Sequence, residues 1–226
     1  MKILVVAATA FEIAPLIAYL KAEFEEKEAY HFQKEEFQIA TLITGVGLTH
    51  TAFAVAKVLA FRKYDLLINA GIAGAFNRAI AIGEVVEVVS DRFADLGVEE
   101  ATGAFSDVFE LGLMTADQFP FSEGKLENPT PGNFLKPAEG LSVNKVHGFA
   151  PTIAAIEKRY PVVAIETMEG AAFFYTCLME KQAFLAIRAI SNYVEPRNRE
   201  NWNIPLAIEN LNRVLIEMIQ NWVQKT

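Results

Sequence analysis

The stretch that decides the fold of this chain is Pro161-Val-Val-Ala-Ile-Glu-Thr-Met-Glu-Gly-Ala-Ala-Phe-Phe174. It opens with an apolar, β-branched run and continues within a few residues as a helical pattern. A buried strand over Val162–Ile165 and a helix over Met168–Glu180 are therefore expected. Open α/β sheets bind their ligands beyond the carboxyl ends of their strands. Glu166 and Glu169 stand at that end and are the first candidates for a functional site.

These carboxylates also have a purely structural explanation, because acids in the first turn of a helix complement the helix dipole. For Glu169 the neighbours weigh against that explanation. Met168 and the small residues Gly170–Ala172 would leave its side chain close to packed backbone, with little room to reach water. We therefore favour a functional role for Glu169.

Two further polar groups follow expected strands. Glu12 comes four residues after the strand Lys2–Ala8, and Ser191-Asn192 come directly after the strand Ala183–Ile190. Alone, Glu12 could be a helix-first-turn carboxylate and Asn192 an ordinary turn residue. Because each group follows a different strand, we expect Glu12, Glu169 and Asn192 to meet at one edge of the sheet.

Two glycine turns are expected between strands and helices. Thr44–Thr49 would open a helix over Thr51–Arg62, and Gly71-Ile-Ala-Gly74 would follow a strand over Leu66–Ala70. His50 occupies the third-glycine position of a dinucleotide fingerprint, so such a cofactor site is weakly supported, and no phosphate-loop lysine motif is present. The turns either bring backbone N–H groups to a ligand or only let helices pack closely, and both interpretations stay open.

The rest of the chain fits alternating strands and helices, except for Asp91–Pro137. That segment is rich in Gly, Pro, Asp and Phe and is expected to form irregular loops. The other expected elements are a hairpin over Ala29–Phe32 and Phe37–Ile43, strands over Glu84–Ser90 and Leu141–Asn144, and helices over Phe11–Lys21, Ala150–Lys158 and Ile204–Val223.

Composition restricts the class of protein. With 226 residues, 52% of them hydrophobic, the chain is expected to form a single α/β domain over residues 1–226. A net charge of −8 argues against a nucleic-acid partner, so a small molecule is the expected one. Cys177 is the only cysteine, which excludes an intrachain disulfide and fits the cytoplasm. His31, His50 and His147 lack metal-ligand spacing, so neither a metal nor another cofactor is expected.

No membrane association is expected from the sequence. The apolar run Ile3–Ala10 is preceded by one lysine and soon followed by Glu12, which does not fit a signal peptide. No segment has the roughly 18 consecutive apolar residues that a membrane span requires.

Five separated motifs together resemble one family. They are Glu12 after the first strand, Thr44-Gly-Val-Gly47, Asn69-Ala-Gly-Ile-Ala-Gly74, Thr167-Met-Glu-Gly-Ala-Ala172 and Arg188-Ala-Ile-Ser-Asn192. In this order and spacing they resemble the nucleoside phosphorylase and nucleosidase superfamily over essentially the whole chain. Within it the run Asn192-Tyr-Val-Glu-Pro-Arg-Asn-Arg-Glu-Asn-Trp202 looks closest to the futalosine hydrolases.

The resemblance implies a purine nucleoside phosphorylase-like fold, a twisted mixed sheet flanked by helices. It also implies cofactor-free cleavage of an N-glycosidic bond and a homodimer or higher homo-oligomer. Glu12 falls on the water-activating acid and Met168-Glu169 on the ribose-binding pair. Asn192 falls where adenine-specific nucleosidases have an aspartate. Ile72 falls where they have a serine, which puts polar contacts there in question, and Thr167 replaces an acid.

The chemistry agrees with these roles. Breaking a ribosyl C1′–N9 bond builds positive charge on the sugar and negative charge on the base, so the site needs a carboxylate near the ribose and a donor near the base. The amide of Asn192 can donate to the O6 of hypoxanthine whatever the pH. Gly74 is expected to line the substrate. Arg197 and Arg199 either hold an anionic 5′ substituent or belong to a solvated loop.

We therefore expect a hydrolase that acts on a 6-oxopurine nucleoside, best exemplified by the conversion of futalosine to hypoxanthine and dehypoxanthine futalosine in menaquinone biosynthesis. Alternatives are a phosphate-dependent purine nucleoside phosphorylase, a methylthioadenosine/adenosylhomocysteine nucleosidase and a non-catalytic nucleoside-binding protein. Against the phosphorylase, Glu12 would repel phosphate where phosphorylases have an anion-binding loop. Against the binding protein, Glu12, Glu169 and Asn192 would be superfluous.

Overall fold

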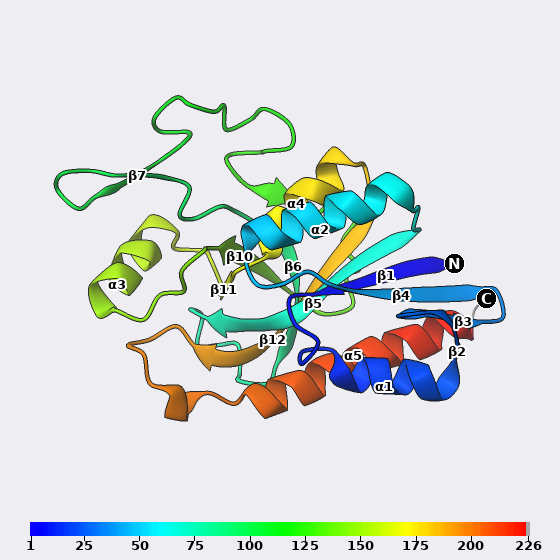
Figure 1. Ribbon diagram of the computed structural model, residues 1–226. Coiled ribbons are helices and arrows are strands. Elements are labelled where there is room, and N and C mark those ends of the chain that lie inside the picture. The colour runs from blue at the N-terminus through cyan, green and yellow to red at the C-terminus, as the bar shows by residue number, and fades with distance from the viewer. Residues whose placement is uncertain (225–226) are drawn as a thin grey trace.

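A mixed sheet forms the centre of the protein and helices cover both of its faces (Figure 1). The computed structural model describes residues 1–224. The helices are α1 (Ala14–Glu23), α2 (Leu48–Phe61), α3 (Ala150–Arg159), α4 (Gly170–Met179) and α5 (Ile204–Val223), with a short 3₁₀ turn, η1, at Arg199–Asn201. The longer strands are β1 (Lys2–Ala7), β4 (Phe37–Ile43), β5 (Leu66–Ala75), β6 (Val85–Asp91), β10 (Lys136–Ser142) and β12 (Phe184–Tyr193). The shorter ones are β2 (Glu25–Glu28), β3 (His31–Lys34), β7 (Gly97–Glu99), β8 (Phe105–Asp107), β9 (Leu126–Glu127) and β11 (Ile165–Thr167).

The main sheet runs in the order β11-β10-β6-β12-β5-β1-β4-β3-β2, with β9 paired to β6. Strand β11 also pairs with β5, so β5, β12, β6, β10 and β11 form a closed ring. Within it β12 is parallel to β5, and β11 is antiparallel to β5. The predicted class, a mixed α/β sheet flanked by helices, is confirmed.

The two faces of the sheet bury separate apolar clusters. One face packs against α2 and α4, through residues such as Val55 and Phe173. The other packs against α1 and α5, through residues such as Leu20 and Leu215. Pro15 lies in the first turn of α1, where the missing N–H of proline costs no helical hydrogen bond.

The predicted turn Gly71-Ile-Ala-Gly74 is wrong, because all four residues lie inside β5. Neither glycine has a positive φ. A side chain at Gly71 would lie 3.0 Å from Glu12 Oε1, and one at Gly74 would lie 3.2 Å from Asn192 Nδ2. These glycines therefore admit neighbouring side chains close to the strand instead of reversing the chain.

Other predicted boundaries shift in the same region. Strand β11 covers Ile165–Thr167 instead of Val162–Ile165, and α4 begins at Gly170 instead of Met168. The last strand continues to Tyr193, so Ser191 and Asn192 belong to β12 and do not follow it.

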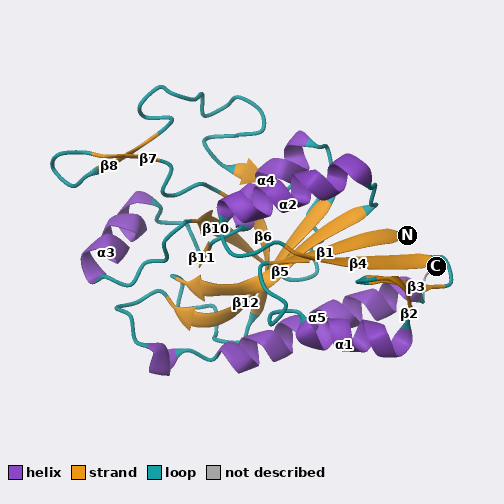
Figure 2. Cartoon of the chain, in the orientation of Figure 1, coloured by secondary structure: helices purple, strands orange, loops and turns teal. Residues whose placement is uncertain are grey.

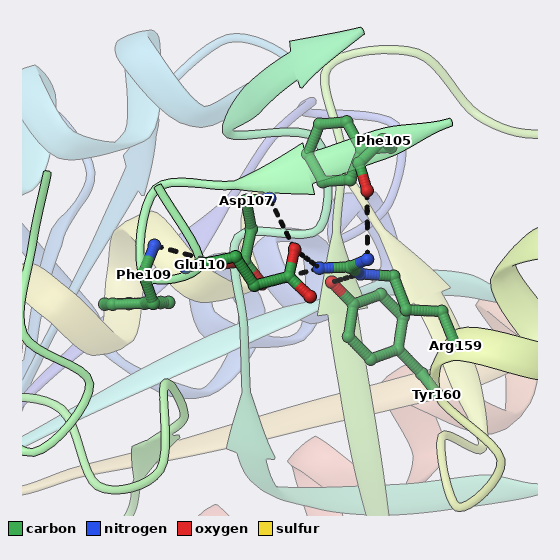
Figure 3. A network of polar contacts seen from close by, with 6 residues as sticks. All are labelled: Phe105, Asp107, Phe109, Glu110, Arg159 and Tyr160. Carbon is green, nitrogen blue, oxygen red and sulfur yellow. Dashed lines mark hydrogen bonds and ion pairs between the residues drawn. The ribbon is translucent and has the colours of Figure 1, made fainter. Parts of the chain in front are cut away.

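The segment Asp91–Pro137 is mostly loop, as predicted, and projects from the ring (Figure 2). It also contains the separate two-stranded sheet β7–β8, which the sequence did not indicate. Arg159, the last residue of α3, holds this segment against the helix (Figure 3). Its Nη2 pairs with Asp107 Oδ2 at 2.8 Å and Glu110 Oε2 at 2.6 Å, and its Nη1 donates to the Phe105 carbonyl at 3.0 Å.

Candidate active site

The carboxylate of Glu12 lies between β1 and α1 and is only 9% exposed. The main-chain N–H and the hydroxyl of Thr9 both donate to its Oε2 at 2.9 Å, and the Ile72 N–H donates to Oε1 at 3.2 Å. It is not in the first turn of a helix, since α1 begins at Ala14. Both oxygens are thus held by hydrogen-bond donors, so the side chain has one fixed orientation.

Glu169 directly precedes α4 and faces the glycine-containing turn before α2. The Gly47 N–H donates to Glu169 Oε1 at 3.0 Å. Gly47 has φ 102°, which explains the need for glycine at this position. Burial raises the pKa of Glu169 and the charge of Glu12 adds to this, while the Gly47 N–H and Arg188 oppose it. The turn therefore binds a carboxylate of the protein itself.

Arg188 is the residue of this cluster to which the sequence assigned no role. It lies within β12, is 1% exposed and donates from Nη1 to the Asn69 carbonyl at 2.9 Å. Its Nη2 donates to the Asn69 side chain. Burial lowers the pKa of Arg188, and the charges of Glu169 and Glu12 counteract this. Arg188 therefore supplies the buried positive charge that allows two acids to lie near each other.

Asn192 lies on β12 directly opposite Gly74 of β5. The Ser191 hydroxyl donates to its Oδ1 at 2.8 Å, and its Nδ2 donates to the Tyr193 carbonyl at 2.9 Å. The register of β12 shifts between Ile190 and Asn192, as at a β-bulge. The bulge and the hydroxyl fix the amide, and one of its N–H groups remains available.

The predicted site residues are brought together only in part. Ile72, Gly74 and Met168 are partly exposed beside the residues just described, and Ile72 contributes its main-chain N–H. Arg197 and Arg199 are exposed on the loop after β12. Their guanidinium groups lie 5.2 and 5.9 Å from the centre of the Trp202 ring. The structure therefore gives both arginines an aromatic partner and no contact with Glu12 or Glu169.

A chain of buried hydroxyl groups lies behind Glu169. The Ser142 hydroxyl donates to Asp91 Oδ1 at 2.9 Å and accepts the Ala171 N–H at 2.8 Å. Thr167 Oγ1 accepts the Gly170 N–H at 3.3 Å. These bonds satisfy the first N–H groups of α4 and thereby fix the start of the helix next to Glu169. Burial raises the pKa of Asp91 to about 7.

Within residues 1–224, no group of three or more His, Cys, Asp or Glu side chains is arranged to hold a metal ion. None of the helices in that range is both long and apolar enough to cross a membrane. The candidate site brings together the carboxylates of Glu12 and Glu169, the buried guanidinium of Arg188 and the amide of Asn192.

The sequence matches the model of the phosphorylase superfamily over residues 2–220, so the chain belongs to that family. One relative is the futalosine hydrolase of Streptomyces coelicolor, 31% identical over 80% of each chain. Another is the 5′-methylthioadenosine/S-adenosylhomocysteine nucleosidase of Glaesserella parasuis, 26% identical over 98% of this chain and 100% of the relative. The two kinds of nucleosidase match about equally well.

Solved structures of both kinds share the fold. The futalosine hydrolase of Helicobacter pylori superposes with a TM-score of 0.76 at 15% identity, over 98% of each chain. The nucleosidase of Neisseria meningitidis in complex with methylthio-immucillin-A gives a TM-score of 0.75 at 19% identity, over 97% of this chain and 99% of its own. At these identities the likeness concerns the fold alone.

Proposed function

We propose that this protein is a nucleosidase that hydrolyses the N-glycosidic bond of a 6-oxopurine nucleoside, with futalosine as the best candidate substrate. The products would be hypoxanthine and dehypoxanthine futalosine, a step of menaquinone biosynthesis. The observation that carries the proposal is the fixed amide of Asn192 opposite Gly74, together with the acids Glu12 and Glu169. Membership of the superfamily and the relatives that are nucleosidases support it.

In the proposed reaction, the oxygen of water attacks C1′ and the C1′–N9 bond breaks. Glu12 takes a proton from the attacking water, for which its buried and fixed carboxylate is suited. Glu169 accepts hydrogen bonds from the ribose hydroxyls, and its charge stabilises the electron-poor sugar. The electron pair of the broken bond leaves with the base, which gains a proton from solvent.

Asn192 would bind the departing base through its amide, donating to O6 and accepting from N7–H. Met168, Ile72 and Gly74 would line the substrate with apolar surface, and Arg197 or Arg199 would hold an anionic group at the 5′ end. No cofactor takes part. We also propose that the protein acts in the cytoplasm and as a homo-oligomer.

A second candidate is methylthioadenosine/adenosylhomocysteine nucleosidase, because relatives of that kind match about as well. Both candidates are hydrolases, and Glu12 argues against phosphorolysis because a carboxylate would repel phosphate.

The test is incubation of the pure protein with futalosine, inosine and methylthioadenosine, each with and without phosphate. We expect hypoxanthine release from futalosine in phosphate-free buffer, with free sugar product and no acceleration by phosphate. A ribosyl-1-phosphate product would contradict hydrolysis, and faster release of adenine than of hypoxanthine would favour the second candidate.

A further inference from the structure

A buried acid and a histidine form a pair to which the proposed reaction gives no role. Glu166 is 4% exposed. Its Oε2 accepts the main-chain N–H of His147 at 3.0 Å, and its Oε1 is hydrogen-bonded to the ring Nδ1 of the same residue. His147 belongs to the loop between β10 and α3. A buried carboxylate needs such partners, so the pair fixes both the loop and the ring.

This pair lies beside the amide that we assign to the base. Glu166 stands directly opposite Gly74 in the antiparallel pairing of β11 with β5, and Asn192 stands opposite Gly74 on β12. Residues directly opposite each other project from the same face of a sheet. Neighbouring strands are about 4.8 Å apart, so Glu166 and Asn192 flank Gly74 at a separation of roughly 10 Å.

Gly74 has no side chain, so neighbouring groups come close to the strand between these two residues. The position that a Cβ atom at Gly74 would take lies 3.0 Å from a methyl carbon of Val194. The amide nitrogen of Asn192 lies 3.2 Å from the position that a Cβ atom at Gly74 would take. Because Asn192 and Glu166 flank Gly74 on the two neighbouring strands, a flat base bound at this end of the strands would have Asn192 along one edge and the residues of the Glu166 pair along another. The closed ring of strands fixes this arrangement.

The chemistry of the pair determines what His147 offers. An ionised Glu166 can only accept, so the ring nitrogen Nδ1 must carry the proton. In the neutral ring the other nitrogen, Nε2, is then an acceptor. No atom of residues 1–224 is hydrogen-bonded to Nε2, and the side chain of His147 is 14% exposed. Nε2 is therefore available to a ligand.

We propose that His147, oriented by Glu166, accepts the N1–H of a 6-oxopurine and thereby selects the base together with Asn192. The inference rests on the proposed function. A 6-oxopurine presents the acceptor O6 next to the donor N1–H, whereas adenine presents an amino group next to an unprotonated N1. Adenine N1 would face the lone pair of Nε2. His147 is thus a specificity residue and Glu166 a positioning residue.

Binding of free bases tests this without requiring turnover. Hypoxanthine, 1-methylhypoxanthine and adenine are titrated calorimetrically into the wild type, His147→Phe, His147→Gln and the control His31→Phe. His31 lies on β3 with its ring nitrogen bonded to the Ala29 carbonyl, so the control makes the same change outside the site.

We expect His147→Phe to weaken hypoxanthine binding about 5- to 150-fold, the cost of an unpaired buried donor, and to leave adenine binding within about twofold. The amide oxygen of His147→Gln can accept the same N1–H and should restore part of the preference. Glu166→Gln should reduce the preference for hypoxanthine over adenine, whereas its melting temperature should change little. His31→Phe should match the wild type.

Equal loss for hypoxanthine and adenine in His147→Phe, or no loss for either, would overturn the inference. If His147→Phe does not fold, His147→Gln decides. Binding of hypoxanthine by His147→Gln that is no tighter than its binding of 1-methylhypoxanthine would also overturn the inference. If the wild type cleaves futalosine and the variants keep its preference for hypoxanthine, His147 is not a specificity residue, and the proposed function stands. A wild type that neither binds nor cleaves any purine would remove the proposed function as well.

Discussion

At the residue scale, the two acids of the site have different surroundings and therefore suit different tasks. Glu12 accepts three hydrogen bonds from Thr9 and Ile72, which fix the orientation of its side chain. Glu169 accepts one from Gly47, and burial raises its pKa. A fixed acceptor suits a general base, and a desolvated carboxylate interacts strongly with a sugar that becomes positive.

We predict that Glu12→Gln and Glu169→Gln fold normally yet lose most turnover. Glutamine keeps the shape of the side chain but not its basicity, so Glu12→Gln should lose roughly 10²-fold or more in kcat. Glu157→Gln, at an exposed position on α3, is the matched control. Thermal unfolding and kcat on futalosine are measured for each variant. Near-native turnover in Glu12→Gln would exclude it as the general base.

The pH profile gives a second prediction for Glu169. Because burial raises the pKa of Glu169, the ionised form is lost at a higher pH than for an ordinary glutamate. The value of kcat/KM should therefore be highest above that raised pKa and fall as the pH decreases through it. The logarithm of kcat/KM is measured against pH for the wild type and Glu157→Gln. An acid limb at the usual glutamate range in both proteins would show that Glu169 is not the titrating group.

For Asn192 we predict that the wild type prefers hypoxanthine nucleosides and that Asn192→Asp narrows or reverses the preference. An ionised aspartate would face O6 with like partial charge, and such a mismatch costs about 1–3 kcal/mol, or roughly 5- to 150-fold. The ratio of kcat/KM for futalosine and its 6-amino analogue is compared in both proteins. An unchanged ratio would mean that Asn192 does not read the base.

The sequence predicted which acids stand near strand ends but not every residue that completes the cluster. Arg188 had a usable signal, because a charge inside the apolar run Ala183–Ile190 has to find buried partners. His147 had none, since it lies in a loop without periodicity and its hydrogen-bond partner Glu166 is distant in the chain. The roles of Glu12, Glu169 and Asn192 stay predictions.

At the element scale, the strands that carry the site are longer than their apolar patterns indicate. Strand β5 continues through Gly71 and Gly74, and β12 continues through Asn192. Glycine and asparagine usually end strands, but here pairing with neighbouring strands keeps the chain extended. The charged strand β2 was missed because its four residues are all exposed and show no alternation.

The loop after β12 gives a prediction at this scale. The guanidinium groups of Arg197 and Arg199 lie over the Trp202 ring, which would hold them in a defined place beside the strand end. If they bind an anionic 5′ substituent, Arg197→Ala or Arg199→Ala should raise KM for futalosine more than KM for inosine, which has no carboxylate. Arg213→Ala, on the exposed face of α5, is the control. Equal changes in KM for both substrates would show that the arginines do not bind the 5′ substituent and that the loop has only a structural role.

At the scale of the whole molecule, closure of the ring by β11 and β5 brings Glu166 opposite Gly74. The two residues are far apart in sequence, and β11 has only three residues. The local spacing of hydrophobic residues in a sequence predicts helices and strands and therefore the class of the fold. The pairing of so short a strand depends instead on the twist and the crossover connections of the complete sheet.

Asp91 links the ring to α4 and should make the stability of the whole protein depend on pH. Its Oδ2 is buried and has no hydrogen-bond partner among residues 1–224, and burial raises the pKa of Asp91 to about 7 from 3.8. Between these values the folded state keeps a proton that the unfolded state has lost. The contribution of Asp91 to the free energy of unfolding therefore falls as the pH rises, by up to about 1.4 kcal/mol per pH unit.

We predict that Asp91→Asn removes this dependence, because the amide stays neutral while its oxygen can still accept from the Ser142 hydroxyl. Relative to the wild type, the variant should be more stable at pH 8 than at pH 5. Urea unfolding at both pH values measures the difference, and Asp117→Asn in an exposed loop is the control. If the free-energy difference between Asp91→Asn and the wild type is the same at both pH values, Asp91 is ionised throughout, and Arg188 then has a third buried negative charge to balance.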